Sequence, residues 1–142
     1  MQTVTHRLLI PVTPGELLDR ISILRVKVRN LLDRAKLSTV TQELHELTDI
    51  WDNSPYSVRM SAEVGRCVKA LIEANQVIWI AENVVRAEAT DPGMMISAAA
   101  RARDANDKRT DLKRRINDEL DVFTTEVKDY TEVRRESQGQ GG

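Results

Sequence analysis

The sequence has few of the residues on which disulfide-stabilised folds and common catalytic sites depend. Among its 142 residues, Cys67 is the one cysteine, and His6 and His45 are the only histidines. A single cysteine excludes an intrachain disulfide framework and any multi-cysteine metal site. Cys67 falls on the apolar arc of its expected helix, so we interpret it as a buried, inert thiol. Neither histidine has a catalytic partner in sequence, and no HExxH pattern, Gly-rich phosphate loop or Ser/His/Asp set is present.

Long apolar runs and an excess of one charge are also missing. The N-terminus lacks the pattern of a signal peptide, and no window is long enough to span a membrane, so we expect a cytoplasmic protein. The formal net charge of −1 gives no global electrostatic case for binding nucleic acid. Charged residues make up 30% of the chain and aromatics 4%, which is typical of a helix-rich soluble protein. We expect one domain over residues 1–130 and a flexible polar tail over 131–142.

The clearest helix begins at Thr13-Pro14-Gly15-Glu16, a capping box with proline at the first helical position. Its carboxylate at Glu16 is expected to reach back to the N–H of Thr13. The helix is predicted to continue to about Lys36, with one apolar stripe and a second, mostly polar row beside it. The stripe consists of Leu17, Ile21, Leu24, Val28 and Leu31, and the row beside it of Glu16, Arg20, Ile23 and Lys27.

Three more helices and two short strands complete the predicted fold. Ser38 or Thr39 is expected to cap the second helix, and the breaker at 52–55 ends it. The third is predicted from Ser57 or Ser61 to Glu88, and the fourth from Pro92 to about Leu120. Residues 6–12 and 122–130 are expected to pair as strands that tie the chain ends together. The predicted fold is therefore an all-α antiparallel four-helix bundle with a minor two-stranded sheet.

Polar side chains interrupt or border the apolar stripes of three of these helices, and they are the candidate site. Guanidinium and ammonium groups bind phosphate, amides bind the polar edges of a ring, and indole offers a stacking face. This set predicts non-enzymatic binding, sequestration included, of a phosphorylated, nucleotide-like or sugar-phosphate ligand. The alternative is a sealed ion-pair and amide network that only fixes helix register. The candidates are Glu16, Arg20, Lys27, Asn75, Trp79, Glu82, Arg86, Asn106, Arg109, Lys113 and Asn117.

Two other functions stay open at this stage. The third helix carries a second apolar face at Val77, Ile80 and Val84, which favours a homo-oligomer and a structural or adaptor role. A metal-dependent nucleotide hydrolase would need paired carboxylates around magnesium. Its candidates are Glu43, Glu46, Asp104 and Asp107, which are more typical of solvated helix faces. We expect no catalytic residue, metal or cofactor.

Three blocks of the chain resemble a family of small bacterial and phage proteins of unassigned function. The blocks are TPGELLDRISILRVK, NQVIWIAE, and NDKRTDLKRRIN followed by TEVKDY. The resemblance covers most of residues 10–130 and supports the fold, but it implies no activity. Its motif positions are Glu16, Asp19, Lys27, Asn75, Trp79, Glu82, Asn106, Arg109, Lys113, Asn117, Glu126, Lys128 and Tyr130.

Overall fold

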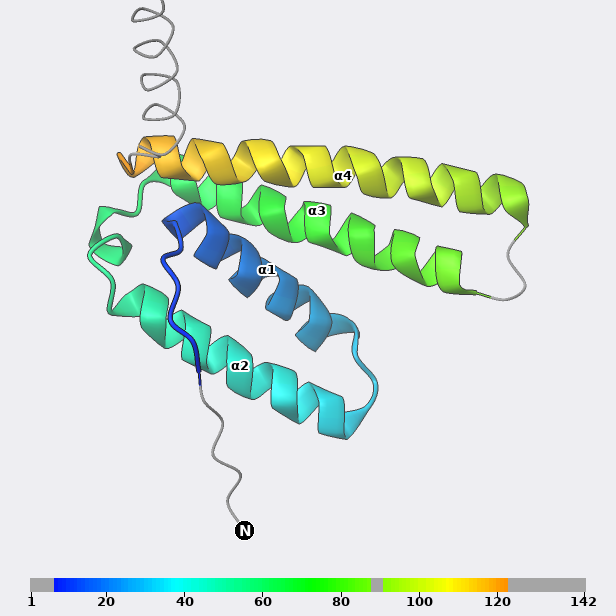
Figure 1. The fold of residues 1–142 in the computed structure, drawn as a ribbon, viewed down its shortest axis with the longest axis horizontal. Helices are drawn as coiled ribbons and strands as arrows, with labels where there is room; N and C mark the ends of the chain where they lie inside the picture. Colours follow the sequence, from blue (N-terminus) through cyan, green and yellow to red (C-terminus); the bar gives the residue numbers. More distant parts are fainter. Residues whose placement is uncertain (1–6, 88–90, 123–142) are drawn as a thin grey trace, which may run out of the picture.

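The protein is a bundle of helices arranged as two antiparallel hairpins (Figure 1). The computed structural model describes residues 7–87 and 91–122, and all regular structure in these residues is helical. The first hairpin joins α1 to α2, and the second, longer one joins α3 to α4. The helices are α1 (Pro14–Asn30), α2 (Arg34–Asp52), α3 (Ala62–Arg86) and α4 (Pro92–Glu119), with a 3-10 turn, η1 (Ser57–Arg59), before α3.

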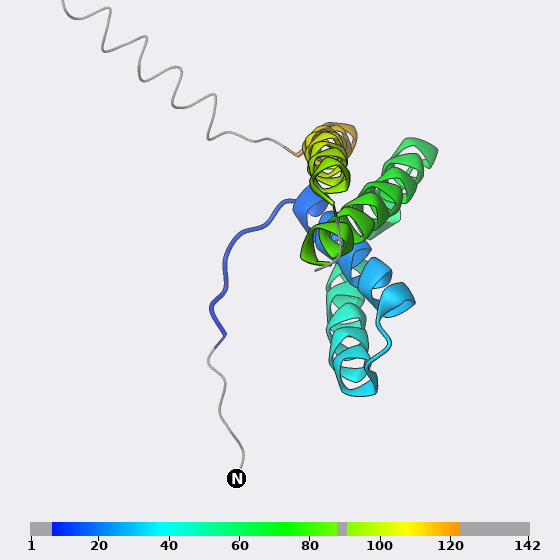
Figure 2. The same cartoon turned by 90° about the vertical axis from the view of Figure 1, so that its right-hand side faces the viewer.

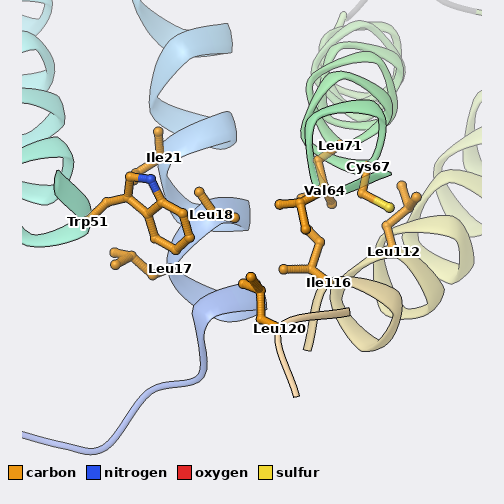
Figure 3. Packing of buried hydrophobic residues seen from close by; sticks show 10 residues of the cluster. All are labelled: Leu17, Leu18, Ile21, Trp51, Val64, Cys67, Leu71, Leu112, Ile116 and Leu120. Carbon is orange, nitrogen blue, oxygen red and sulfur yellow. The ribbon is translucent and has the colours of Figure 1, made fainter. Parts of the chain in front are cut away.

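α1 is the central element, because it packs against each of the other three helices. α4 contacts its N-terminal half, α3 contacts it from Asp19 to Asn30, and α2 covers its other side (Figures 1 and 2). Side chains from all four helices meet around it and form one hydrophobic core (Figure 3). The core consists of Leu17, Leu18 and Ile21 from α1, Trp51 from α2, Val64, Cys67 and Leu71 from α3, and Leu112, Ile116 and Leu120 in or at the end of α4.

Predicted caps set the starts of three helices. The hydroxyl of Thr13 accepts from the backbone N–H of Glu16 at 3.2 Å, with Pro14 at the first helical position. Ser61 accepts from the N–H of Val64, and Asp91 accepts from the N–H of Met94. These contacts confirm the cap predicted at Thr13 and the start predicted for α4 at Pro92, and they place the start of α3 after Ser61 and not at Ser57.

The boundary between α1 and α2 differs from the prediction. α1 ends at Asn30 rather than near Lys36, and α2 begins at Arg34 rather than after Ser38 or Thr39. The Asp33 carboxylate accepts from two backbone N–H groups at the start of α2, at 2.9 and 3.1 Å. The N-cap at Asp33 therefore starts a new helix, so residues 34–36 belong to α2 and not to the end of α1.

The predicted N-terminal strand is wrong for the residues that the structure describes. Residues 7–12 form no strand, and Leu8 and Leu9 are more than nine-tenths exposed. The one described contact of this segment with another element is the ion pair of Arg7 with Glu46 of α2, a helix that offers no strand for pairing, and Pro11 lacks a backbone N–H. The proposed partner over 122–130 lies, except for Val122, outside the described residues, as does the 131–142 tail.

α1 and α4 approach each other most closely at Gly15. A Cβ added to Gly15 would lie 2.5 Å from the carbonyl oxygen of Lys113 and 3.0 Å from Oδ1 of Asn117. The first of these atoms belongs to the backbone of α4, which cannot move aside without shifting the helix. Glycine is therefore required here by the contact between the helices.

Replacing Gly15 and Gly65 by alanine should have opposite effects on stability. Gly15→Ala should lower the free energy of unfolding by about 2 kcal/mol, because the added methyl group overpacks the α1–α4 contact. Gly65→Ala should raise it by about 0.5–1 kcal/mol, because Gly65 lies within α3 with nothing within 4 Å of an added Cβ. Urea denaturation of both variants checks this, and a neutral Gly15→Ala would contradict the close approach.

Candidate functional site

A buried carboxylate on α1 binds polar side chains from α3 and α4. Asp19 is 2% exposed, and its two oxygens accept from Nε and Nη2 of Arg109 at 3.1 and 2.6 Å. Nδ2 of Asn75 donates to the same carboxylate at 3.1 Å, and Nη1 of Arg109 donates to Asn106 at 2.9 Å. We call these four residues the Asp19 network. The bidentate geometry and the extra hydrogen bond are what a buried ion pair needs to offset its desolvation.

A second polar contact closes the N-terminus of α1 against the last turns of α4. Asn117 accepts from the backbone N–H of Gly15 at 2.8 Å and donates to the hydroxyl of Thr13 at 3.2 Å. Lys113 lies 3.7 Å from Glu16. Glu16 therefore forms an ion pair across to α4, whereas the capping box predicted a bond back to Thr13. These contacts attach the end of one helix to the side of another, so we assign them a structural role.

A cavity of about 360 Å³ opens between α1 and α3 at the edge of the Asp19 network, and we call it the α1–α3 cavity. Its apolar wall comes from the aliphatic residues Ile23, Val26 and Ile78 together with the half-buried Trp79. Its volume lies at the lower end of the range typical of ligand pockets. Its polar lining consists of Lys27, Asn75, Glu82, Asn83, Arg86 and Arg109.

The cations around the α1–α3 cavity differ in how far they are neutralised. Arg109 is held by the buried Asp19 carboxylate. Arg86 lies 3.4 Å from Glu82, but both side chains are more than half exposed, so this pair is weak and exchangeable. Lys27 is half-buried and has no ion-pair partner among the described residues. The cavity therefore has cationic charge available at Lys27 and Arg86.

The predicted candidates divide between these three places. Lys27, Asn75, Trp79, Glu82, Arg86 and Arg109 line the α1–α3 cavity, although Asn75 and Arg109 also belong to the Asp19 network. Glu16, Lys113 and Asn117 join α1 to α4, and Asn106 supports Arg109 from outside. Arg20 is exposed and lines none of these contacts.

Two residues of the site escaped the sequence-based candidate set. Asn83 lies on the cavity rim, one position from Glu82, and no pattern in the sequence marks it. Asp19 lies on a second buried face of α1, together with Leu18, Ser22 and Val26. The spacing of four between Leu18, Ser22 and Val26 was the signal for that face, and a search for a single stripe passed over it.

The residues considered for metal binding or catalysis in the sequence do not line the α1–α3 cavity. The described residues contain no group of three or more His, Cys, Asp or Glu side chains that could hold a metal ion. Glu43 and Glu46 lie on α2, which packs on α1, whereas Asp104 and Asp107 lie on the exposed side of α4. Cys67 is 2% exposed, and burial raises the pKa of its thiol, with a smaller contribution from Glu63. A buried thiol with a raised pKa fits the predicted inert role.

Comparisons of the chain with protein-family models, curated proteins and solved structures found no match. The resemblance to a bacterial and phage family therefore stays a prediction. No helix in residues 7–87 and 91–122 combines the length and apolar character needed to cross a bilayer.

Arg109→Ala should lower the free energy of unfolding by about 3 kcal/mol, because it leaves the Asp19 carboxylate buried without its cation. Thermal or urea denaturation measures the loss. Adding Asp19→Ala in the same chain should recover part of it, since the unpaired charge is then removed. Strictly additive losses in this double-mutant cycle would show that the two side chains are not coupled.

Proposed function

We propose that the protein binds a small, phosphorylated, nucleotide-like molecule in the α1–α3 cavity and does not turn it over. The observation that carries the proposal is the position of Lys27, a half-buried cation without an ion-pair partner in the described chain, in a cavity with an aromatic wall. A buried or half-buried charge is costly unless something compensates it. An anionic ligand would supply that compensation.

Each remaining part of the α1–α3 cavity matches one part of such a ligand. Arg86 would join Lys27 on the phosphate, exchanging its exposed contact with Glu82 for a stronger, charge-assisted one. Trp79 offers its indole face to a planar ring. Asn83 and Glu82 would hydrogen-bond to ring edges or sugar hydroxyls. Arg109 is assigned to holding the wall of the cavity rather than to the phosphate, because Asp19 already neutralises it.

A structural or adaptor function is the second candidate, and the complete Asp19 network favours it. Among the described residues, no fully buried side-chain nitrogen or oxygen lacks a hydrogen-bond partner. Such a network needs no ligand to be stable. It accounts for Asp19, Asn75 and Arg109, but it leaves the position of Lys27 without a role.

Binding should be detected by thermal shift and then by calorimetry against nucleotides, cyclic nucleotides, nucleotide sugars and sugar phosphates. A ligand at a hundred times its Kd should stabilise the fold by about 2.7 kcal/mol. Lys27→Met, which keeps an unbranched side chain one atom shorter and removes the charge, should weaken binding of the best ligand at least tenfold without lowering the Tm of the free protein. Trp79→Leu should weaken nucleotides more than sugar phosphates, since only the former present a base to the indole.

Lys69→Met is the matched control, because Lys69 is an exposed cation on α3 outside the cavity. It makes the same change in net charge and should leave the affinity unchanged. Equal weakening by Lys27→Met and Lys69→Met would show that the ligand senses only the overall charge and would overturn the assignment of the site. No stabilisation by any compound of the panel would overturn the nucleotide-like ligand and favour the adaptor function.

A further inference from the structure

The outer face of α4 carries two charged rows with a period of seven. Arg101, Lys108 and Arg115 form a cationic row, and Asp104, Asp111 and Asp118 form an acidic row beside it. Residues seven apart lie nearly above one another on a helix, so each row is continuous along the surface. All members of both rows are exposed. We call these six residues the α4 charge rows.

The α4 charge rows border an open groove between α3 and α4. The groove has a volume of about 880 Å³, and every member of the rows except Asp118 lines it. Its floor is made of small and aliphatic side chains: Ala70, Ala74, Val77, Ala105 and Leu112. Val77 belongs to the second apolar face of α3, which the sequence already marked as a surface for a partner. The charged lining comes from α4, apart from Glu73 on the α3 side. An apolar groove is the form of a site that receives an amphipathic helix.

Five of the six charges in the rows have no ion pair in the described chain, and the sixth, Asp111, has only an exposed and therefore weak pair. Neighbouring members stand three or four residues apart, where an Asp and an Arg or Lys can form an ion pair on one helix. In the described chain no member of the rows forms an ion pair with another member, and Asp111 pairs instead with Arg114, at 3.7 Å. The charges are therefore available to a partner.

We propose that the groove receives α4 of a second copy of this chain, packed antiparallel to form a two-fold symmetric dimer. When the two copies of α4 are aligned so that Lys108 lies opposite Asp111 of the other copy, the remaining members match as well. Arg101 then lies opposite Asp118, and Asp104 opposite Arg115. Two-fold symmetry repeats each pair, so every charge of both rows has an opposite partner.

The alternative two-fold arrangement does not have this property. In a parallel dimer each residue lies opposite its own copy, so Arg101 meets Arg101 and Asp104 meets Asp104. Such like-charge contacts are destabilising. In the antiparallel dimer, the aliphatic parts of the Arg and Lys side chains can also cover the alanine floor, while their charged ends reach the acidic row of the other copy. The charge pattern therefore selects a second copy and its direction.

Asp104 and Arg115 provide the sharpest test, because they stand eleven positions apart on α4, about 16 Å at 1.5 Å per residue. That separation exceeds the Debye length at physiological salt, so they do not interact within one chain. Asp104→Arg and Arg115→Asp should each raise the dimer dissociation constant at least tenfold, because each places like charges opposite each other twice per dimer. Sedimentation equilibrium over a concentration series measures the constant, and circular dichroism checks that both variants remain helical.

Two recombinations of these changes should restore dimers. The double variant Asp104→Arg/Arg115→Asp exchanges the two charges and should dimerise like the wild type. Mixing the two single variants should give a heterodimer, since the arginine introduced at position 104 of one copy faces the aspartate introduced at position 115 of the other. At the second contact of that heterodimer, the original Arg115 of the Asp104→Arg chain lies opposite the original Asp104 of the Arg115→Asp chain. Arg103→Glu, on α4 outside both rows, is the control and should leave the dissociation constant unchanged.

The dimer is overturned if the wild type sediments at its monomer mass of 16.1 kDa throughout the series. The arrangement is overturned if the single variants dimerise as well as the wild type, or if the mixture of the two stays monomeric. None of these measurements depends on a ligand in the α1–α3 cavity, so their failure is distinguishable from a failure of the proposed binding function.

Discussion

The burial of the Asp19 carboxylate is the constraint on which the arrangement of three helices depends. A charge that is 2% exposed is tolerated only with a close cation and further hydrogen bonds, and α4 and α3 supply these through Arg109 and Asn75. The same face of α4 continues at spacings of four to Lys113 and Asn117, which contact α1 at successively earlier positions. The three contacts follow one another in opposite chain directions on the two helices. They fix the register of α1 on α4 more specifically than apolar packing alone would do.

Local rules were sufficient to predict the helices but not the way they meet. The starts of α1, α3 and α4 depend on short-range signals, and the structure confirms the predicted cap at Thr13 and shows further caps at Ser61 and Asp91. The end of α1 at Asn30 was not predicted, because helix propensity extends the helix through Leu31 and Leu32, whereas the cap at Asp33 starts a new helix. Asp19 is one of the motif positions of the resemblance, but it was left out of the candidate site because α1 is buried on more than one face and shows no single clean stripe.

The candidate residues were found as a group, but their division into two roles needed the structure. A cation at a core position predicts a buried partner or a visiting anion, and the sequence does not distinguish between them. The geometry assigns Arg109 to Asp19 and leaves Lys27 without an ion-pair partner in the described chain. Stability and the proposed ligand affinity therefore depend on different cations of the same cavity, Arg109 and Lys27, so mutation can test them separately.

The two faces of the α3–α4 hairpin require different kinds of contact. The face toward α1 is held by buried, directional polar bonds, whereas the groove on α3 and α4 carries exposed charges that are individually worth little. Such charges contribute to specificity by excluding a wrong register or direction. Because a seven-residue repeat drifts by about 20° per heptad on a straight helix, two copies of α4 would cross at a shallow left-handed angle. Helices in bundles commonly cross at this angle, because the side chains of one helix then pack between those of its neighbour. The seven-residue period of the charges and the shape of the groove therefore favour the same partner, a second α4.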